Sequence, residues 1–180
     1  IVIMNITEQT NSMIQKNSLF DKGFLDYMKN AENDVLYKTG EKLRHRSAEG
    51  GLDTVGYGHK LTETEIATGQ VYDYKLDTLT KEQADDILLK DLEKKNQMLI
   101  NKLGTSYTNL DSKRKQMLLD VEFNVRDGVD AFPNFTKGVL QNKIDVMKKE
   151  YERKFTDSKG ETKPLTRRNE LFSNFFFGKN

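Results

Sequence analysis

The chain has 180 residues, of which 36% are hydrophobic, and its 29 basic and 28 acidic residues give a formal net charge of +1. This length and near-neutral charge are typical of one folded domain, which can consist of two lobes, and they give no general attraction to nucleic acid. The absence of cysteine excludes disulfides and thiolate chemistry. No apolar run approaches the roughly 20 residues that span a bilayer, and residues 1–10 are too short and too weakly basic for a secretory signal.

The first part of the chain predicts an arm followed by a helix. Residues 1–20 are polar and weakly patterned, so we expect an arm or a short helix there. From Leu19 to about Tyr37, apolar residues recur at helical spacing. Glu32 lies near the end of this predicted helix.

A glycine-rich stretch follows, HRSAEGGLDTVGYGHKL at residues 45–61, and it holds both histidines of the chain. Its glycines allow turns with positive φ and the close approach of a ligand. Alternation around Thr54 predicts a strand or a tight hairpin. Residues 62–65 predict a short helical turn, and residues 68–79 are interpreted as a loop.

The second half of the chain is predicted to be mostly helical. Thr80 and Gln83 form a capping box before an amphipathic helix that runs to about Gly104. Further helices are expected from about residue 110, over 134–155 and over 165–179, with a polar loop at 156–164. A mostly helical chain with one small β region indicates an α+β fold, in which the long helix would connect two lobes.

The glycine-rich stretch also concentrates groups that handle protons. Glu49 and Asp53 supply carboxylates, Thr54 a hydroxyl and His59 a titratable ring, while Glu32 lies upstream on the predicted helix. A carboxylic acid on a helix that faces polar groups on a β turn suits the cleavage of a glycosidic bond. One carboxyl protonates the leaving oxygen, and a second group positions water or stabilises the oxocarbenium-like state. Taken alone, however, a glycine-rich turn with acidic residues is more often only a turn.

Other kinds of site are weaker expectations. A metal site is disfavoured because its candidate ligands lack the spacing of zinc motifs: His45, Glu49, Asp53 and His59. Neither a GxxxxGK[ST] phosphate loop nor a GxSxG serine elbow is present. One local basic cluster is interpreted as a solvated helix face: Lys148, Lys149, Arg153 and Lys154. We therefore expect no metal, no cofactor and no nucleic-acid partner.

The string TVGYGH, residues 54–59, resembles the T-[IV]-G-[YI]-G-H signature of phage-type lysozymes, the muramidases of glycoside hydrolase family twenty-four. The wider string SAEGGLDTVGYGHKL resembles a branch found in phage endolysins and virion-associated lysozymes. The resemblance covers about residues 30–176. It implies a lysozyme-like α+β fold with a small β lobe around 40–75, a connecting helix near 80–104 and a larger helical lobe behind it.

The resemblance also implies roles for individual residues. The family places a catalytic glutamate on a helix upstream of the signature threonine, and Glu32 stands at that place. Thr54 would hold the attacking water. Tyr57 and Gly58 would line the cleft, and His59 would be a structural histidine fixed by an acidic neighbour.

Two later segments resemble the family with less specificity. Within LDSKRKQMLLDVEFNVRDGVDAFPNFTKGVLQ, residues 110–141, Phe123 and Asn124 match positions that border the active-site cleft. PLTRRNELF resembles the segment whose arginine pairs with the catalytic glutamate. Arg167 is the closer match there, and Arg168 is the alternative.

The second carboxylate departs from the family pattern. The family's best-known members carry an aspartate six residues before the threonine, where this chain has Ala48. Glu49 is one residue nearer, and a glycine-rich loop absorbs such a shift easily. Asp53 directly precedes Thr54 and would point to the opposite face of the strand. We therefore expect Glu49 to be the second carboxylate, with Asp53 as the alternative.

The resemblance implies hydrolysis of the β-1,4 bond between N-acetylmuramic acid and N-acetylglucosamine in bacterial peptidoglycan, with no metal or cofactor. The expected setting is phage lysis or cell-wall penetration, from the host cytoplasm or the virion, without a signal peptide. Residues 1–20 would form an arm and residues 21–180 the catalytic domain, and other virion proteins are partners if the chain belongs to a longer one. Two alternatives stay open: a lytic transglycosylase acting on the same bond, and a non-catalytic wall-binding or virion structural module.

Overall fold

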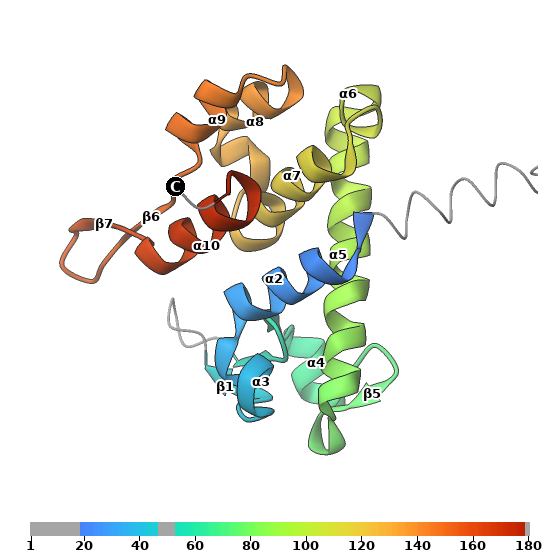
Figure 1. Ribbon diagram of the computed structural model, residues 1–180. Coiled ribbons are helices and arrows are strands. Elements are labelled where there is room, and N and C mark those ends of the chain that lie inside the picture. The colour runs from blue at the N-terminus through green and yellow to red at the C-terminus, as the bar shows by residue number, and fades with distance from the viewer. Residues whose placement is uncertain (1–18, 47–52, 179–180) are drawn as a thin grey trace, which may run out of the picture. The chain divides into compact units, whose positions relative to one another are not determined.

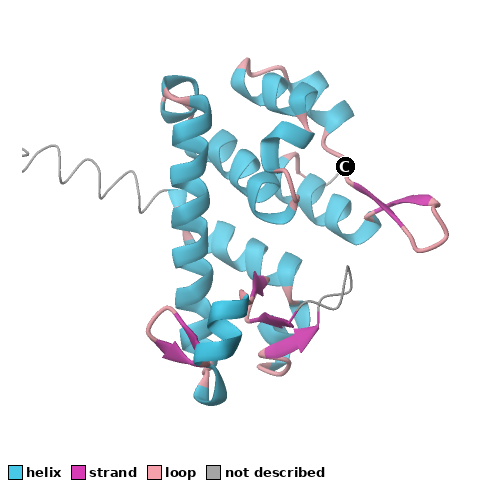
Figure 2. Ribbon diagram, turned by 180° about the vertical axis from the view of Figure 1, so that it is seen from behind, coloured by secondary structure: helices cyan, strands magenta, loops and turns pink. Residues whose placement is uncertain are grey.

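A computed structural model describes residues 19–46 and 53–178, and Figures 1 and 2 show it from opposite sides. The chain divides into two compact units. One unit comprises Asp26–Lys94, and the other joins the segment that ends at Leu25 to the chain from Lys95 onward. Helix α5 (Lys81–Leu103) contributes residues to both units. The predicted α+β fold, with a long helix between a β-containing part and a helical part, is confirmed.

The unit at Asp26–Lys94, called the small unit below, is built from short elements. In chain order these are the later part of α2 (Lys22–Glu32), α3 (Asp34–Thr39), β1 (Arg44–Arg46), β2 (Asp53–Val55), β3 (His59–Lys60), α4 (Glu63–Thr68), β4 (Gln70–Val71), β5 (Tyr74–Lys75), the 3-10 helix η1 (Leu76–Thr78) and the first part of α5. Figure 1 shows α3, α4, β1 and β5 gathered around the same end of α5. This unit holds the TVGYGH string, as the sequence predicts for the β lobe.

Two small antiparallel sheets form in this unit. Strands β1, β2 and β3 pair in that order, so that Thr54 stands opposite His45 on one side and Lys60 on the other. Strands β4 and β5 form a separate hairpin. Both sheets and α5 contribute to one buried apolar cluster: Val55, Leu61, Val71, Leu76 and Ile87. Burial of apolar surface therefore holds the short strands against the long helix.

The helix predicted from Leu19 to about Tyr37 is broken in the structure. Helix α2 ends at Glu32 and α3 begins at Asp34. Between them Asn33 has φ −150° and ψ 84°, outside the helical region. The Asn33 Oδ1 atom accepts a hydrogen bond from the Leu36 N–H at 3.1 Å, which caps the start of α3.

The other unit, called the helical unit below, consists almost entirely of helices. After α5 come α6 (Thr105–Thr108), α7 (Ser112–Asn124), η2 (Gly128–Ala131), α8 (Pro133–Leu140), α9 (Ile144–Glu150), β6 (Lys154–Thr156), β7 (Thr162–Pro164) and α10 (Thr166–Phe176). Phe172 and Phe176 on α10 are buried, and the ring of Phe172 stacks on Tyr151 with 5.5 Å between centroids. Phe175 is 37% exposed. The phenylalanines of α10 therefore do not all face the core.

Two expectations for local structure were wrong, and a third was wrong in part. The predicted helix over 134–155 is two helices, because Asn142 adopts φ 55° and turns the chain between α8 and α9. The predicted loop at 68–79 contains the β4–β5 hairpin and η1. The predicted loop at 156–164 is mostly the connection of the β6–β7 hairpin, which stands out from the helices of its unit in Figure 2. Strands of two or three residues are too short to show an alternating pattern in sequence.

A buried carboxylate and a glycine form a close contact in the helical unit. Gly128 has φ +58°, and a Cβ atom placed on it would lie 1.9 Å from Glu122 Oε2. Glu122 is 1% exposed, and its carboxylate accepts hydrogen bonds from Lys102 Nζ at 2.9 Å and from the Val129 N–H at 2.9 Å. The carboxylate is thus fixed and has little freedom to move away.

We expect Gly128→Ala to lower the free energy of unfolding by at least about 2 kcal/mol, because left-handed strain adds to steric overlap. Gly160→Ala is the matched control, since Gly160 has φ +81° but no atom within 4 Å of an added Cβ. The control should lose only the conformational part, about 1 kcal/mol. Urea unfolding measures both variants, and equal losses would contradict the overlap.

Candidate active site

The predicted acid and the predicted water-holding threonine both lie in the small unit. Glu32 is the last residue of α2 and is half-buried. Thr54 is the middle residue of β2, the central strand of its sheet, and is 3% exposed. Asn33, the residue after Glu32, reaches the same strand, because its Nδ2 donates a hydrogen bond to the Gly56 carbonyl oxygen at 3.0 Å. The end of α2 is thereby bound to the turn that follows Thr54.

The turn at Gly56 packs closely on α5. Gly56 has φ +59°, and an added Cβ would lie 3.1 Å from the Cβ of Ala84. The next residue, Tyr57, is 1% exposed, and burial raises the pKa of its phenol, with a further contribution from the nearby Asp85 carboxylate. Lys29 Nζ lies 2.8 Å from Asp85 Oδ2 and 5.8 Å from the centroid of the Tyr57 ring. The Tyr57 ring thus supports the turn from inside, and a role for Tyr57 in binding substrate stays a prediction.

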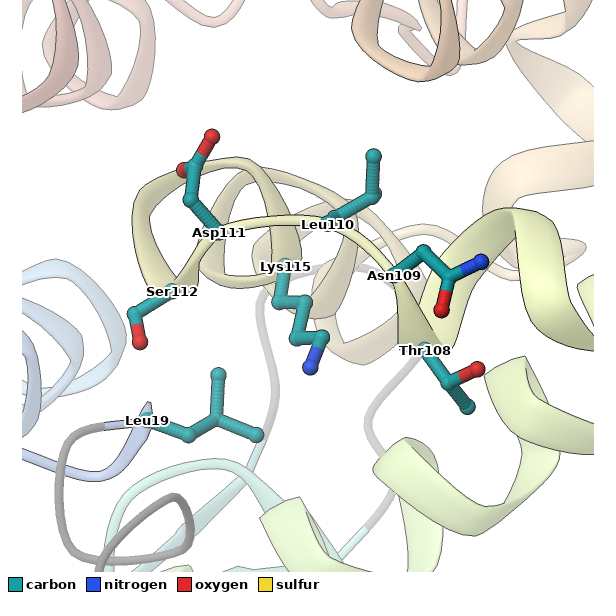
Figure 3. A pocket seen from close by; sticks show the side chains of 7 residues that line it. All are labelled: Leu19, Thr108, Asn109, Leu110, Asp111, Ser112 and Lys115. Atoms are coloured by element: carbon teal, nitrogen blue, oxygen red, sulfur yellow. The ribbon is translucent and has the colours of Figure 1, made fainter.

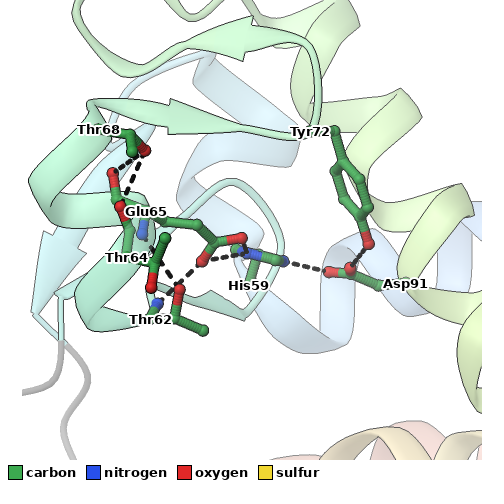
Figure 4. Close-up of polar contacts among 7 residues, drawn as sticks. All are labelled: His59, Thr62, Thr64, Glu65, Thr68, Tyr72 and Asp91. Atoms are coloured by element: carbon green, nitrogen blue, oxygen red, sulfur yellow. Dashed lines mark hydrogen bonds and ion pairs between the residues drawn. The ribbon is translucent and has the colours of Figure 1, made fainter.

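His59 lies between two carboxylates (Figure 4). Its Nδ1 is 2.7 Å from Asp91 Oδ2 on α5, and its Nε2 is 3.2 Å from both oxygens of Glu65 on α4. Glu65 also accepts a hydrogen bond from the Thr62 N–H at 2.8 Å, and Tyr72 donates its hydroxyl to Asp91 Oδ1 at 2.5 Å. The residue that ends the TVGYGH string therefore has an acidic neighbour on each ring nitrogen, the environment that the sequence predicts for a structural histidine.

These contacts set the charge of the ring. Burial alone would lower the pKa of His59, but the hydrogen bonds and charges of Asp91 and Glu65 outweigh it and raise the pKa above the usual value. Burial likewise opposes the charge on Glu65, yet bonds from Thr62 and His59 bring the pKa of that carboxyl below its usual range. The cluster therefore favours a protonated His59 between two carboxylates.

Glu49 and Asp53 are the two candidates for the second carboxylate. Glu49 lies outside the described residues, as does Ala48. Asp53 accepts hydrogen bonds from Arg44, at 3.1 Å from Nε and 2.5 Å from Nη2. Arg44 lies on the neighbouring strand β1, so this ion pair joins the two strands across the sheet.

In the helical unit, the matched arginine segment contains a buried ion cluster. Asp120 on α7 is fully buried and accepts hydrogen bonds from Arg153 and from Arg168 on α10. Burial would raise the pKa of Asp120, but the two guanidinium groups outweigh it and hold the pKa below the usual range. Arg153 also donates to Asn124 Oδ1 at 3.3 Å. The charge of this carboxylate is thus compensated on both oxygens, which a buried charge requires.

The remaining predicted residues are placed as follows. Phe123 and Asn124 are half-buried at the end of α7, Gly58 is half-buried in the turn before β3, and Arg167 is exposed at the start of α10. Arg168, the alternative to Arg167, is 7% exposed and bound to Asp120. Whether these side chains contact substrate stays a prediction.

Sequence reasoning missed the place of Arg153. It was interpreted as part of a solvated basic face, but it is 2% exposed and pairs with Asp120. The reason is that α9 ends at Glu150, so Arg153 lies beyond the end of the helix and has no place on a helix face. One signal was available, because Asp120 interrupts the apolar run MLLDV, and an acid at a core position needs a basic partner.

The hollow shown in Figure 3 does not coincide with these residues. It has a volume of about 470 Å³, lies in the helical unit and is lined by Leu19, Thr108, Asn109, Leu110, Asp111, Ser112 and Lys115. Burial lowers the pKa of Lys115, which points into it. None of the predicted site residues lines this hollow. Its polar rim by itself identifies no ligand.

The described residues contain no group of three histidine, cysteine or acidic side chains arranged to hold a metal ion. Across residues 19–46 and 53–178, no helix has both the length and the apolar character needed to cross a membrane.

The described fold defines a class of protein. A small antiparallel sheet carrying the TVGYGH turn, packed on a long helix that continues into a helical unit, is the α+β arrangement of lysozyme-like enzymes. The family model described as phage lysozyme matches residues 38–170, well over half of the chain, and the chain belongs to that family. A search of curated proteins found no match. Membership implies a glycosidase that acts on peptidoglycan. The matched region includes Thr54 and His59, whereas Glu32 lies just before it.

The His59 cluster predicts a pH-dependent stability. Because the pKa of His59 is raised in the folded protein, its contribution is fully present below its unfolded pKa of about 6.5 and is lost as the pH rises through the folded value. We expect His59→Asn to lower the free energy of unfolding by about 1.5–3 kcal/mol at pH 5.5 and by less at pH 9. Urea unfolding at both pH values tests this. His45→Asn controls for loss of a histidine as such, and a pH-independent effect at His59 would contradict the charge argument.

Proposed function

We propose that the chain hydrolyses the β-1,4 bond between N-acetylmuramic acid and N-acetylglucosamine, as a muramidase of glycoside hydrolase family twenty-four. The observation that carries this proposal is the hydrogen bond from Asn33 to Gly56, because it brings the helix end that bears Glu32 to the turn after Thr54. A carboxylic acid placed beside polar groups that can position water suits the acid-catalysed cleavage of a glycosidic bond.

In this mechanism Glu32 protonates the leaving glycosidic oxygen. Its position at the end of α2, which Asn33 binds to the turn after Thr54, suits a proton donor to a sugar bound beside that turn. Thr54 and Glu49 hold the attacking water on the opposite face of the sugar, which inverts the configuration. Inversion calls for two carboxyl groups roughly 6.5–9.5 Å apart, against about 5 Å for a retaining pair.

Glu49 is preferred to Asp53 for a physical reason. The two oxygens of Asp53 are engaged by the Arg44 guanidinium on the neighbouring strand. A carboxylate held by a bidentate arginine is a weak base and has little freedom to bind water. The pair with Arg44 therefore gives Asp53 a role in joining strands.

The other predicted residues support the reaction. His59, fixed between Asp91 and Glu65, keeps the turn after Thr54 on α5. Gly58, Phe123 and Asn124 would border the bound glycan, and Arg167 would orient Glu32, with Arg168 as the alternative.

The biological setting follows from the same proposal. Residues 21–180 would be the catalytic domain of a phage lysis enzyme or of a virion protein that penetrates the wall, whereas the arm expected at residues 1–20 lies almost wholly outside the described residues. Peptidoglycan is its partner, and other virion proteins are further partners in the second setting.

A lytic transglycosylase is the second candidate, and Ala48 favours it. Such an enzyme cleaves the same bond without a second carboxylate, and this chain lacks the aspartate that the best-known family members carry at that position. The two reactions differ in product, because hydrolysis leaves a reducing muramic end and the transglycosylase leaves a 1,6-anhydro end.

We expect Glu32→Gln to reduce the clearing of purified peptidoglycan by at least about a hundredfold, because glutamine keeps the shape but donates no acidic proton. The measurement is turbidity loss together with mass spectra of the released fragments. Wild type should release reducing muramic ends. Anhydro ends would identify the transglycosylase, and a wild type that clears no wall type would identify a binding or structural module.

The second carboxylate is tested by the pair Glu49→Gln and Asp53→Asn. We expect Glu49→Gln to lower kcat by about a hundredfold or more, since it removes a group that positions water. Asp53→Asn should keep kcat within a few fold and lose thermal stability, because it weakens the bond to Arg44. The opposite ranking of the two kcat values would assign the role to Asp53.

A further inference from the structure

We propose that Asn33 is a positioning residue for catalysis, whose side-chain amide fixes Glu32 relative to Thr54. This inference rests on the proposed function and adds to it a residue that acts through its neighbours without touching substrate. The Asn33 amide sets the geometry between the acid on α2 and the strand that holds water.

The Asn33 side chain makes an unusually complete set of hydrogen bonds. It is 8% exposed. Its Oδ1 accepts from the Leu36 N–H at 3.1 Å, and its Nδ2 donates to the carbonyl oxygens of Gly56 at 3.0 Å and Lys42 at 3.1 Å. Both amide protons and one acceptor site are therefore used. Because the group is buried, each of these bonds is costly to lose.

The partners of this amide lie just outside two paired strands, β1 and β2. Gly56 follows β2, and Lys42 precedes β1. The same two segments are joined directly, since the Gly56 N–H donates to the Leu43 carbonyl oxygen at 2.7 Å. The amide of Asn33 thus binds both chain segments at this end of the β1–β2 pair, and these segments are also bonded to each other.

The place of Asn33 in the chain makes this contact relevant to the acid. Glu32 is its immediate neighbour and the last residue of α2, so the Glu32 backbone cannot shift without moving Asn33. A second contact, from Lys29 to Asp85, holds α2 on α5. That ion pair fixes the helix on its support, whereas the Asn33 amide fixes the helix end on the turn after Thr54.

Catalysis by an acid and a positioned water is sensitive to such a contact. The two groups must flank the bond at a set separation, and a displacement of about 1 Å costs about a hundredfold in rate. Loss of the amide donor would let the helix end and the turn separate while each element keeps its own hydrogen bonds. The effect should appear in kcat more than in substrate binding.

The test is Asn33→Ser, which separates the two tasks of Asn33. Serine is also a favoured N-cap, so α3 keeps its cap. Its single hydroxyl is shorter and has one proton, so it cannot donate to both Gly56 and Lys42. We expect kcat on solubilised peptidoglycan to fall about tenfold to a hundredfold, with KM changed by no more than about twofold, in assays well below the melting temperature.

Gln116→Ala is the matched control. Gln116 is another buried amide, and its Nε2 donates to the Leu19 carbonyl oxygen at 2.9 Å and to Asp21 Oδ2 at 3.2 Å. It lies on α7 in the helical unit. This variant should lose stability to a similar degree and keep the kcat of wild type. If Asn33→Ser does not fold, Asn33→Gly removes the same amide at an N-cap position that tolerates glycine.

The outcomes separate this inference from the proposed function. Active wild type, inactive Glu32→Gln, and a kcat loss in Asn33→Ser that Gln116→Ala does not show support both. Active wild type with Asn33→Ser losing only stability, as Gln116→Ala does, overturns the positioning role alone. A wild type without activity, or an active Glu32→Gln, overturns the proposed function and this inference with it.

Discussion

The aspartates of α5 hold the polar segments of the small unit in place. Asp85 pairs with Lys29 on α2, and Asp91 binds both His59 and the Tyr72 hydroxyl. The same helix also carries Ile87, which belongs to the buried apolar cluster of this unit. A long helix can thus position short strands and turns that have little stability of their own, since two-stranded hairpins are marginal in water. Burial of apolar surface stabilises the unit, and the hydrogen bonds and ion pairs of the carboxylates fix where each segment lies on the helix.

The helical unit uses the same principle with a deeper carboxylate. Asp120 is fully buried, and its charge is tolerated because Arg153 and Arg168 approach its two oxygens. Such a cluster adds little net stability compared with apolar packing, but removal of one partner leaves an uncompensated charge. Its effect is to fix α10 and the segment before β6 on α7. The segment PLTRRNELF, which resembles the family segment that carries an arginine, is therefore held on α7 by the ion pair between Arg168 and Asp120. The resemblance alone did not indicate this acid.

Much of the fold was predictable because its signals are local and repeated. The capping box at Thr80 and Gln83 begins α5 as expected, with both hydrogen bonds present, and the apolar stripe defines its length. The strand around Thr54 also follows from alternation and nearby glycines.

The rest depends on single side chains whose partners are distant in sequence. A one-residue break at Asn33 leaves the helical period almost unchanged, so periodicity alone cannot reveal it. The β4–β5 and β6–β7 hairpins are too short for a pattern, and the latter is stabilised by Asp157, whose Oδ1 accepts from two backbone N–H groups of its own turn. For the site, the TVGYGH string located the turn, whereas the amide that joins it to Glu32 required the fold to be known.

The break at Asn33 also explains how the end of a helix is joined to the sheet. A helix that continued past Glu32 would keep the next residue in helical geometry, with its side chain on the helix surface. Because α2 ends at Glu32, Asn33 leaves helical geometry and its amide turns toward the sheet. One change of backbone conformation thus binds the helix end that carries Glu32 to the turn that follows Thr54.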